Sequence, residues 1–370
     1  MDTVNTPGKE ARTRSSEEKV SIRKSVFGQF PTGETVHRFT LGDPIGPSVE
    51  VSEYGSTLLA VKMPDRQGRM DDVILRHSSL ENCIADKDYL GVTVGRYANR
   101  ITGAKIKIDG ESIQLAANQD GNHLHGGFRG FGKKLWKGSV IEQDGIPAVR
   151  MEMLSPHDEE GYPGNLQCRA TFSFRDHRWL DVVYEAKTDR PTIINMTLHP
   201  YFNLAGPGGD LSQHMLTLHA DSFLPMRPEM VPTGEVKAVA GTLFDFRKPA
   251  SPLAEMDFKN EQIKLANGYD HCWILRGKPG EMKLAAELKD GSSGRTVQIH
   301  TTAPGLQFYS GNYLGANTPG NGHGGFRPHA AFALEPQAWP DSPSHVDFPN
   351  VILRPGELYT HRITYIFGTE

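Results

Sequence analysis

The sequence predicts an all-β protein, folded as a large antiparallel sandwich with only a few short helices. Its 39 glycines and 25 prolines follow no repeat period, which is typical of many short strands joined by turns. Several segments alternate apolar and polar residues with the period of two that a half-buried strand requires. No segment needs a helix longer than about three turns, and together these features favour a β-sandwich.

The composition limits the partners and the compartment. The formal net charge of −4 argues against nucleic acid or an anionic membrane as the main partner. The chain has no apolar run of about 18 residues, and its first residues are polar, so we expect no membrane span and no secretory signal. Cys83, Cys168 and Cys272 lack Cys-x-x-Cys spacing, which favours reduced thiols in a cytoplasmic protein. We expect a monomer or a homodimer.

The N-terminal part is expected to begin with a flexible tail. Residues 1–22 are charged and rich in Ser and Thr, so they cannot bury enough surface to become ordered. No break in composition follows, and residues 23–370 are predicted to form one domain. Residues 51–63 form a β-type run with a bend or bulge at Tyr54-Gly55. Residues 79–89 are the best candidate for a short helix.

The middle and the end of the chain are predicted to consist of hairpins and a meander. Residues 104–115 alternate around Asp109-Gly110, which is a strong hairpin signal. The segment 225–252 is rich in proline and is expected to be an irregular loop. The other predicted strands are 149–154, 167–174, 179–186, 213–219, 272–275, 282–288, 295–300 and 359–367.

Glu335 is the first candidate for a functional residue. It ends the apolar run Phe332-Ala333-Leu334, and Pro336 is expected to stop the strand there because it has no N–H to donate. A carboxylate at the mouth of an apolar strand is poorly solvated, so its pKa should rise toward the range of a general base. The alternative is a glutamate that only pairs with a nearby arginine and holds the loop.

Histidines give the second group of candidates. In residues 192–204, alternation places Asn195, Thr197 and His199 on one face of a strand, which lines a cavity or else faces solvent. His123 and His125 form a His-x-His pair that could hold a metal on one face of an extended segment. Because no third ligand stands at a suitable spacing, we favour histidines satisfied by the backbone and predict no metal.

The polar residues expected at strand ends are suited to a sugar. Carbohydrate sites combine hydroxyl-binding groups with aromatic faces, here Phe202, Trp273 and Phe308. One Glu and one His can transfer protons at two oxygens, whereas Asp270 with Glu335 leaves a glycosidase open. No Gly-x-Ser-x-Gly motif is present, which argues against a serine hydrolase of that type. The polar set is Asn99, Arg100, His125, His199, Asp270, Gln307 and Glu335.

Six segments, taken in this order, resemble the aldose 1-epimerase (galactose mutarotase) family. They are Asn99-Arg100, Leu124-His125-Gly126-Gly127, residues 195–206, Tyr269-Asp270-His271, residues 307–312 and residues 335–349. The resemblance covers residue 26 to the C-terminus and implies a galactose mutarotase-like β-supersandwich with an open sugar cleft. It also implies an isomerase that interconverts the α and β anomers of free aldoses, such as glucose or galactose, without a cofactor. Alternatives are a hexose-6-phosphate 1-epimerase and a non-catalytic sugar-binding module.

The resemblance also implies roles for individual residues. Glu335 matches the general base that takes the proton from the C1 hydroxyl, and His199 matches the acid that protonates the ring oxygen. The matching substrate-binding positions are Asn99, Arg100, His125, Asp270 and Gln307. Departures from the family pattern at Leu198, Pro200, Pro336 and Cys272-Trp273 affect the expected substrate preference more than the chemistry. The Gly- and His-rich segment 319–328 has no assignment.

Overall fold

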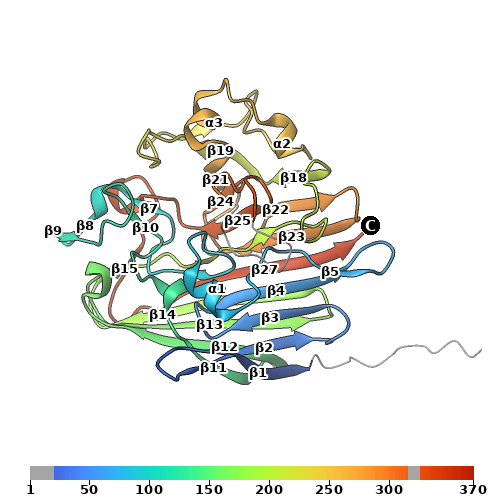
Figure 1. Cartoon of the computed structure of the whole chain (residues 1–370). Coiled ribbons are helices and arrows are strands. Elements are labelled where there is room, and N and C mark those ends of the chain that lie inside the picture. Colours follow the sequence, from blue (N-terminus) through green and yellow to red (C-terminus); the bar gives the residue numbers. More distant parts are fainter. Residues whose placement is uncertain (1–20, 316–325) are drawn as a thin grey trace, which may run out of the picture.

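A computed structural model describes residues 21–315 and 326–370, and it confirms the all-β prediction (Figure 1). Strand β1 begins at Ile22, the last residue of the predicted tail, and residues 1–20 lie outside the described part. Most of the unassigned segment 319–328 lies outside it as well. The strands form three main sheets, accompanied by several two-stranded ladders.

The largest sheet has eight antiparallel strands and contains the predicted meander and the predicted hairpin of residues 282–300. Its order is β11 (Lys137–Gln143), β12 (Ile146–Ser155), β13 (Leu166–Arg175), β14 (Trp179–Thr188), β27 (Tyr359–Thr369), β23 (Arg295–Thr301), β22 (Lys283–Asp290) and β18 (His214–Leu218). Side chains such as Phe172, Val182 and Tyr365 are fully buried, whereas Arg175 and Asp181 form an ion pair on the other face. The sheet therefore has one apolar face, on which the rest of the molecule packs.

A five-stranded sheet covers one part of that apolar face. Its order is β1 (Ile22–Gln29), β2 (Thr35–Gly42), β3 (Ser48–Ser52), β4 (Thr57–Pro64) and β5 (Met70–Asp72). The predicted bend at Tyr54-Gly55 is confirmed. The β-type run 51–63 is not one strand, however, because the bend separates β3 from β4, which pair with each other. Phe39 and Val51 of this sheet belong to the same buried cluster as Phe172.

A six-stranded sheet completes the sandwich and holds Glu335. Its order is β17 (Tyr201–Phe202), β25 (Phe332–Gln337), β24 (Gly305–Tyr309), β21 (Asp270–Leu275), β19 (Ala220–Leu224) and β20 (Lys237–Ala238). Phe308 and Trp273 pack from this sheet into the common core, so the sheet is anchored directly behind the strands that carry the candidate residues.

The expectation that Pro336 ends its strand is wrong, because β25 continues to Gln337 and pairs with β24 at Leu306 and Gly305. The Pro336 carbonyl accepts hydrogen bonds from Thr197 and His361, so this edge of the proline faces away from β24. On that side β17 pairs only with the first two residues of β25, and no ladder bond is lost at the proline.

The segment 192–204 also differs from the prediction of one strand. It forms three short pieces with three different partners: β15 (Thr192–Ile193) pairs with β26 (Ile352–Leu353), β16 (Thr197–Leu198) with β6 (Thr93–Val94), and β17 with β25. Asn195, Thr197 and His199 are buried, so the alternative of a solvent-facing side is wrong. The remaining ladders are β7 (Arg100–Ile101) with β10 (His123–Leu124), and the predicted hairpin β8 (Lys105–Ile108) with β9 (Glu111–Gln114).

Helices are few and short, as predicted. The expected helix is α1 (Leu80–Ala85), and the Ser79 side chain caps it by accepting a hydrogen bond from the Asn82 N–H. Two further helices, α2 (Pro252–Glu255) and α3 (Glu261–Ala266), were not predicted. Within the described residues no helix is both long and apolar enough to cross a membrane. The segment 225–252 is largely irregular, as expected.

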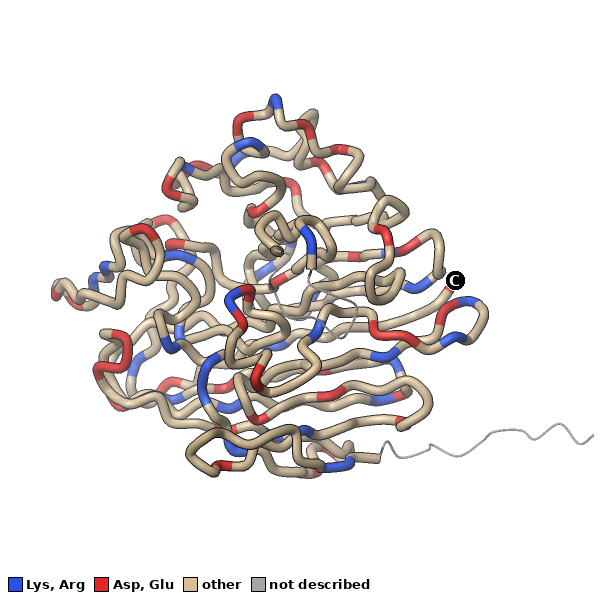
Figure 2. Tube along the Cα trace, in the orientation of Figure 1, with Lys and Arg blue, Asp and Glu red and all other residues tan. Residues whose placement is uncertain are grey.

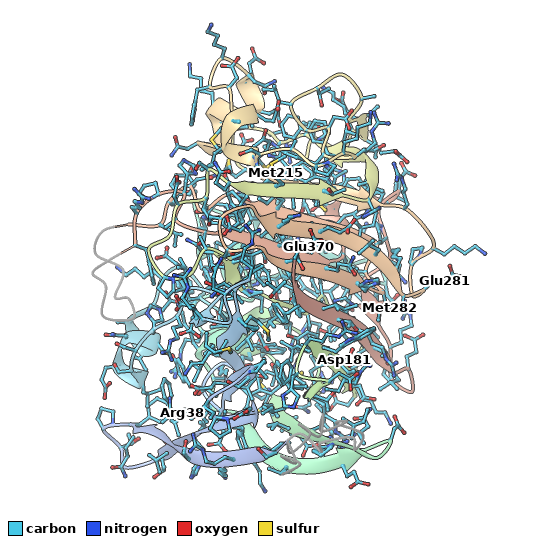
Figure 3. All side chains as sticks on the ribbon, turned by 90° about the vertical axis from the view of Figure 1, so that its right-hand side faces the viewer. Arg38, Asp181, Met215, Glu281, Met282 and Glu370 are labelled. Atoms are coloured by element: carbon cyan, nitrogen blue, oxygen red, sulfur yellow. The ribbon has the colours of Figure 1, made fainter. Side chains whose placement is uncertain are left out.

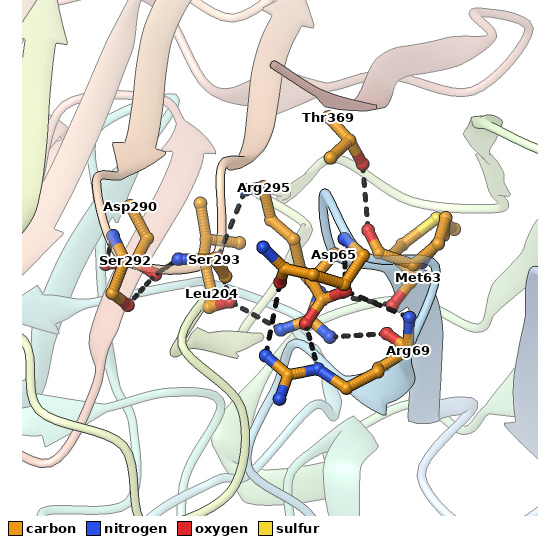
Figure 4. Close-up of polar contacts among 11 residues, drawn as sticks. Met63, Asp65, Arg69, Leu204, Asp290, Ser292, Ser293, Arg295 and Thr369 are labelled. Carbon is orange, nitrogen blue, oxygen red and sulfur yellow. Dashed lines mark hydrogen bonds and ion pairs between the residues drawn. The ribbon is translucent and has the colours of Figure 1, made fainter.

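Buried polar groups tie separate segments together at one end of the molecule. The Arg295 guanidinium donates hydrogen bonds to the carbonyls of Met63, Leu204 and Arg69 (Figure 4). Basic and acidic residues are interspersed along the chain, consistent with its small net charge (Figure 2). Figure 3 faces the side of the molecule on which Met215 lies, at the edge strand β18 of the eight-stranded sheet.

Candidate active site

A pocket of about 220 Å³ brings together six of the seven residues predicted to form the site. Asp270 and Glu335 come from the six-stranded sheet, and His199 precedes β17. The other three, Asn99, Arg100 and His125, come from the segments around β7 and β10.

Gln307 is the exception, because it is not among the residues that line the pocket. Its side chain is buried, and its Nε2 donates a hydrogen bond of 2.7 Å to Asp270 Oδ1. In this geometry Gln307 holds Asp270, and its direct contact with a substrate stays a prediction.

Glu335 and His199 face each other in this pocket. The distance from Glu335 Oε1 to His199 Nε2 is 3.4 Å, and both side chains are buried. The hydrogen bond from the Thr197 hydroxyl to the Pro336 carbonyl joins the two segments that carry them. The alternative in which Glu335 only pairs with an arginine is wrong, since its ion-pair partner among the described residues is His199.

Burial shifts the pKa values of both groups toward their neutral forms. Desolvation raises the pKa of Glu335 well above 4.5, the charge of Asp270 raises it further, and Arg100 opposes the rise. Desolvation lowers the pKa of His199 from 6.5 to about 4. These shifts favour a pair that holds one proton, on Glu335. Transfer of that proton to His199 gives an ionised base beside a protonated acid without exchange with solvent.

Arg100 and Asp270 form a polar wall of the pocket. Arg100 Nη1 lies 3.4 Å from Asp270 Oδ2, and Arg100 Nε donates to Gln119 Oε1 at 2.7 Å. With the hydrogen bond from Gln307 to its other oxygen, Asp270 is fixed from two sides. Such charge-assisted hydrogen bonds hold planar groups in one orientation, as the recognition of hydroxyl groups requires.

His125 is fixed by Asn99 through two contacts. The backbone N–H of Asn99 donates to the ring nitrogen Nδ1 of His125, and the backbone N–H of His125 donates to the Asn99 carbonyl, both at 3.2 Å. Desolvation lowers the pKa of His125 well below 6.5, so its ring is neutral. Because Nδ1 accepts a hydrogen bond, the ring carries its proton on Nε2 and acts there as a donor.

This tautomer bears on metal binding. Ligand atoms of His125, His199 and Glu335 lie within 4.8 Å of one another, which is close enough to surround a cation. A metal needs a free imidazole lone pair, however, and the one lone pair of neutral His125 accepts the Asn99 N–H. These three residues therefore fit a metal poorly.

The hypothesis of a metal held by His123 with His125 is wrong. The φ angle of 48° at His125 breaks the extended geometry that would place both rings on one face. His123 is buried elsewhere, where its Nδ1 bonds the Ala116 carbonyl and its Nε2 bonds the Tyr162 hydroxyl. Both ring nitrogens of His123 thus have hydrogen-bond partners within the protein, which agrees with the favoured alternative to a metal site.

The predicted aromatic residues do not line the pocket. Phe202, Trp273 and Phe308 are fully buried in the core, so their assignment to the site is wrong. Strand alternation is the reason, because Phe308 lies between Gln307 and Tyr309 and therefore points to the opposite face of β24.

The aromatic lining is instead made of tyrosines. Tyr89 and Tyr201 lie beside the His199 ring at centroid distances of 6.2 and 4.9 Å. Residues two positions apart on a strand lie on the same face. The residues two positions after His199 and Gln307 are Tyr201 and Tyr309, so alternation would have identified both tyrosines. No sequence signal marked the other lining residues that the prediction missed, among them Lys87, Asp88, Tyr89, Gln119 and Tyr313.

Comparisons with known proteins agree with this fold and this site. The family model for aldose 1-epimerase matches residues 37–366. The chain belongs to the aldose 1-epimerase family. It is similar to galactose mutarotase of Homo sapiens, with 40% identity over 94% of this chain and 99% of the relative. It is also similar to aldose 1-epimerase of Escherichia coli (strain K12), with 36% identity over 92% of this chain and 97% of the relative.

A solved structure gives the same result for the fold. Galactose 1-epimerase from Lactobacillus acidophilus NCFM superposes with a TM-score of 0.83 and 29% identity, covering 95% of this chain and 99% of that chain. The predicted family and β-supersandwich are thereby confirmed, and the chain is an enzyme of the isomerase class.

Proposed function

We propose that this epimerase interconverts the α and β anomers of a free aldose, with Glu335 as general base and His199 as general acid. The observation that carries the proposal is the 3.4 Å approach of Glu335 Oε1 to His199 Nε2 in the wall of one small pocket. Two proton-transfer groups at that distance can reach two neighbouring oxygens of one sugar ring, O1 and O5.

The reaction begins when ionised Glu335 takes the proton of the C1 hydroxyl. The C1–O5 bond breaks, its electron pair goes to O5, and protonated His199 delivers a proton there. The open-chain aldehyde then rotates about C1–C2. In re-closure His199 takes the proton back from O5, and Glu335 returns a proton to O1, so that the other anomer forms.

The proton balance of these steps agrees with the electrostatics of the pocket. After ring opening Glu335 is protonated and His199 is neutral, which is the state that burial of both groups favours. The pair itself holds one proton before ring opening and one proton after it. Each positioned proton transfer contributes on the order of 10²–10⁴ to the rate.

A free sugar suits the pocket better than a hexose 6-phosphate. Two cationic residues stand among the described lining residues, and one of them, Arg100, is paired with Asp270 at 3.4 Å. The other, Lys87, is exposed and stands between Asp86 and Asp88 in the sequence. A phosphate group is usually bound by several cations, so a single exposed lysine beside two aspartates favours a phosphate less than a neutral sugar.

Two other functions are less well supported. A glycosidase would need two free carboxyl groups at the scissile bond, but Asp270 is held by Arg100 and Gln307. A non-catalytic sugar-binding module would not need an acid and a base in contact. The named activities of the human and Escherichia coli relatives also favour an epimerase, and galactose is the first sugar to test.

Polarimetry on freshly dissolved α-D-galactose and α-D-glucose tests the proposal. Both sugars should reach their equilibrium rotation faster with the protein, whereas glucose 6-phosphate should keep its uncatalysed rate. Unchanged rates for galactose, glucose, arabinose and xylose would overturn the proposal.

The free thiols Cys83, Cys168 and Cys272 suit a reducing compartment, and we place the enzyme in the cytoplasm as part of the same proposal.

A further inference from the structure

The second ring nitrogen of His199 is not held by any other residue that the structure describes. His199 Nε2 faces Glu335 Oε1 at 3.4 Å, whereas Nδ1 is buried and accepts or donates no hydrogen bond to another described residue. A histidine that transfers protons is usually oriented by a partner at its second nitrogen. In this pocket the orientation of the ring therefore has to come from packing.

Three aromatic rings pack around the His199 imidazole. The ring centroids of Tyr201, His125 and Tyr89 lie 4.9, 5.5 and 6.2 Å from its centroid. Tyr89 also packs on His125, at a centroid distance of 4.7 Å. The Tyr89 ring therefore contacts both imidazoles of the sugar pocket.

The backbone of Tyr89 has a conformation that a bulky side chain disfavours. Its φ angle is 60°, in the left-handed region that glycine adopts most readily. Such strain persists only where the surrounding structure imposes it, and it is common at functional sites. Here the Asp86 carboxylate accepts the backbone N–H groups of Asp88 and Leu90, at 3.1 and 2.9 Å, and the Tyr201 hydroxyl donates to the Asp88 carbonyl at 2.8 Å. The turn thus holds an aromatic residue at a position that would suit glycine better.

The same turn is fastened to the backbone of His199. The Gly91 N–H donates to the His199 carbonyl at 2.9 Å, and the His199 N–H donates to the Val92 carbonyl at 3.1 Å. Lys133 Nζ lies over the Tyr89 ring, 5.9 Å from its centroid. These contacts fix the position of the Tyr89 ring relative to the histidine on which it packs.

We propose that Tyr89 is a positioning residue of the epimerase, whose ring holds the imidazoles of His199 and His125 in the orientation that proton transfer requires. The proposal rests on the proposed role of His199 as general acid. The contacts that carry it are made by the aromatic ring, so the role needs the ring and not the hydroxyl group.

Polarimetry with galactose on matched variants tests the proposal. Tyr89→Phe keeps the ring and should retain the parental kcat. Tyr89→Ala should lower kcat about 10–100-fold with a smaller change in KM, because misplacing a reacting group by about 1 Å can cost that much. Phe30→Ala is the control and should retain parental kcat and KM, since Phe30 is a half-buried ring that packs on Tyr54 and does not line the sugar pocket.

A glycine variant separates positioning from stability. Tyr89→Gly adopts the left-handed conformation without strain, so the turn should fold even if Tyr89→Ala does not. Its kcat should nevertheless fall by a similar factor, because the ring is absent. A parental kcat in Tyr89→Gly, a rise in KM alone, or an equal loss of kcat in Tyr89→Phe would each overturn the proposal.

A crystal structure of Tyr89→Gly gives a readout that is independent of activity. The His199 ring should be rotated away from Glu335, or occupy two orientations, while the turn of residues 86–92 stays in place. An unmoved His199 ring would overturn the positioning role of Tyr89. A parent protein without epimerase activity would instead refute the proposed function, and the crystal structure would still decide whether Tyr89 orients His199.

Discussion

The change of Glu335 to glutamine tests the proposed base with the smallest change in shape. The amide has nearly the volume of the carboxyl group but cannot take a proton from the C1 hydroxyl. Loss of one general base lowers the rate by about 10²–10⁴, which corresponds to roughly 3–5 kcal/mol of transition-state stabilisation. We expect kcat to fall by this factor, with a much smaller change in KM.

The same variant should gain stability relative to the parent as pH rises above 4.5. Burial raises the pKa of Glu335 well above 4.5, so above pH 4.5 the unfolded chain ionises this group while the folded chain keeps it protonated. Stability of the parent therefore falls as pH rises from 4.5 through the folded-state pKa. Glu335→Gln removes this loss, and its free energy of unfolding should increase relative to that of the parent as pH rises through this window.

A matched pair controls for the substitution itself. Glu287 and His219 also form a Glu–His pair, 3.0 Å apart, but both are partly exposed and neither lines the sugar pocket. Glu287→Gln should retain parental kcat and KM in the polarimetric assay. Parental kcat in Glu335→Gln, or an equal loss in Glu287→Gln, would refute the assignment of Glu335 as the base.

The other predictions concern the acid, the polar wall and metal dependence. His199→Asn should lower kcat about 10²–10⁴-fold, whereas His219→Asn should not. Because burial lowers the pKa of His199 to about 4, kcat/KM of the parent should stay level from pH 7 down to about 5 and fall near pH 4; a fall near 6.5 would contradict this. Asp270→Asn should raise KM about 10–100-fold, through a weakened hold on Arg100, with less effect on kcat. Exhaustive chelation should leave activity unchanged, and restoration of a lost activity by added metal would contradict the poor fit of the site to a metal.

Local patterns predicted most of the fold because strands and turns leave short-range signals. The meander β12–β14 and the hairpins β8–β9 and β22–β23 follow from alternation and turn residues alone. The strand end at Pro336 was predicted wrongly because the tolerance of a proline depends on where the neighbouring strand β17 stops. That information is absent from the local sequence, as is the division of residues 192–204 among three partners.

Family motifs predicted the residues of the site better than arguments from composition and strand alternation did. The resemblance supplied the roles of Glu335 and His199, whose approach depends on a tertiary contact between distant segments. The aromatic residues were assigned to the wrong face because composition was used where alternation along β24 should have decided. Asn260, which caps α3, shows that a readable local signal was also overlooked.

A crystal structure of Glu335→Gln with bound galactose tests the central claim most directly. The claim is that one sugar ring spans both proton-transfer groups. O1 should lie within hydrogen-bonding distance of the substituted side chain at position 335, and the ring oxygen should lie within the same distance of His199. A galactose bound in the pocket with its anomeric carbon turned away from these two positions would contradict it.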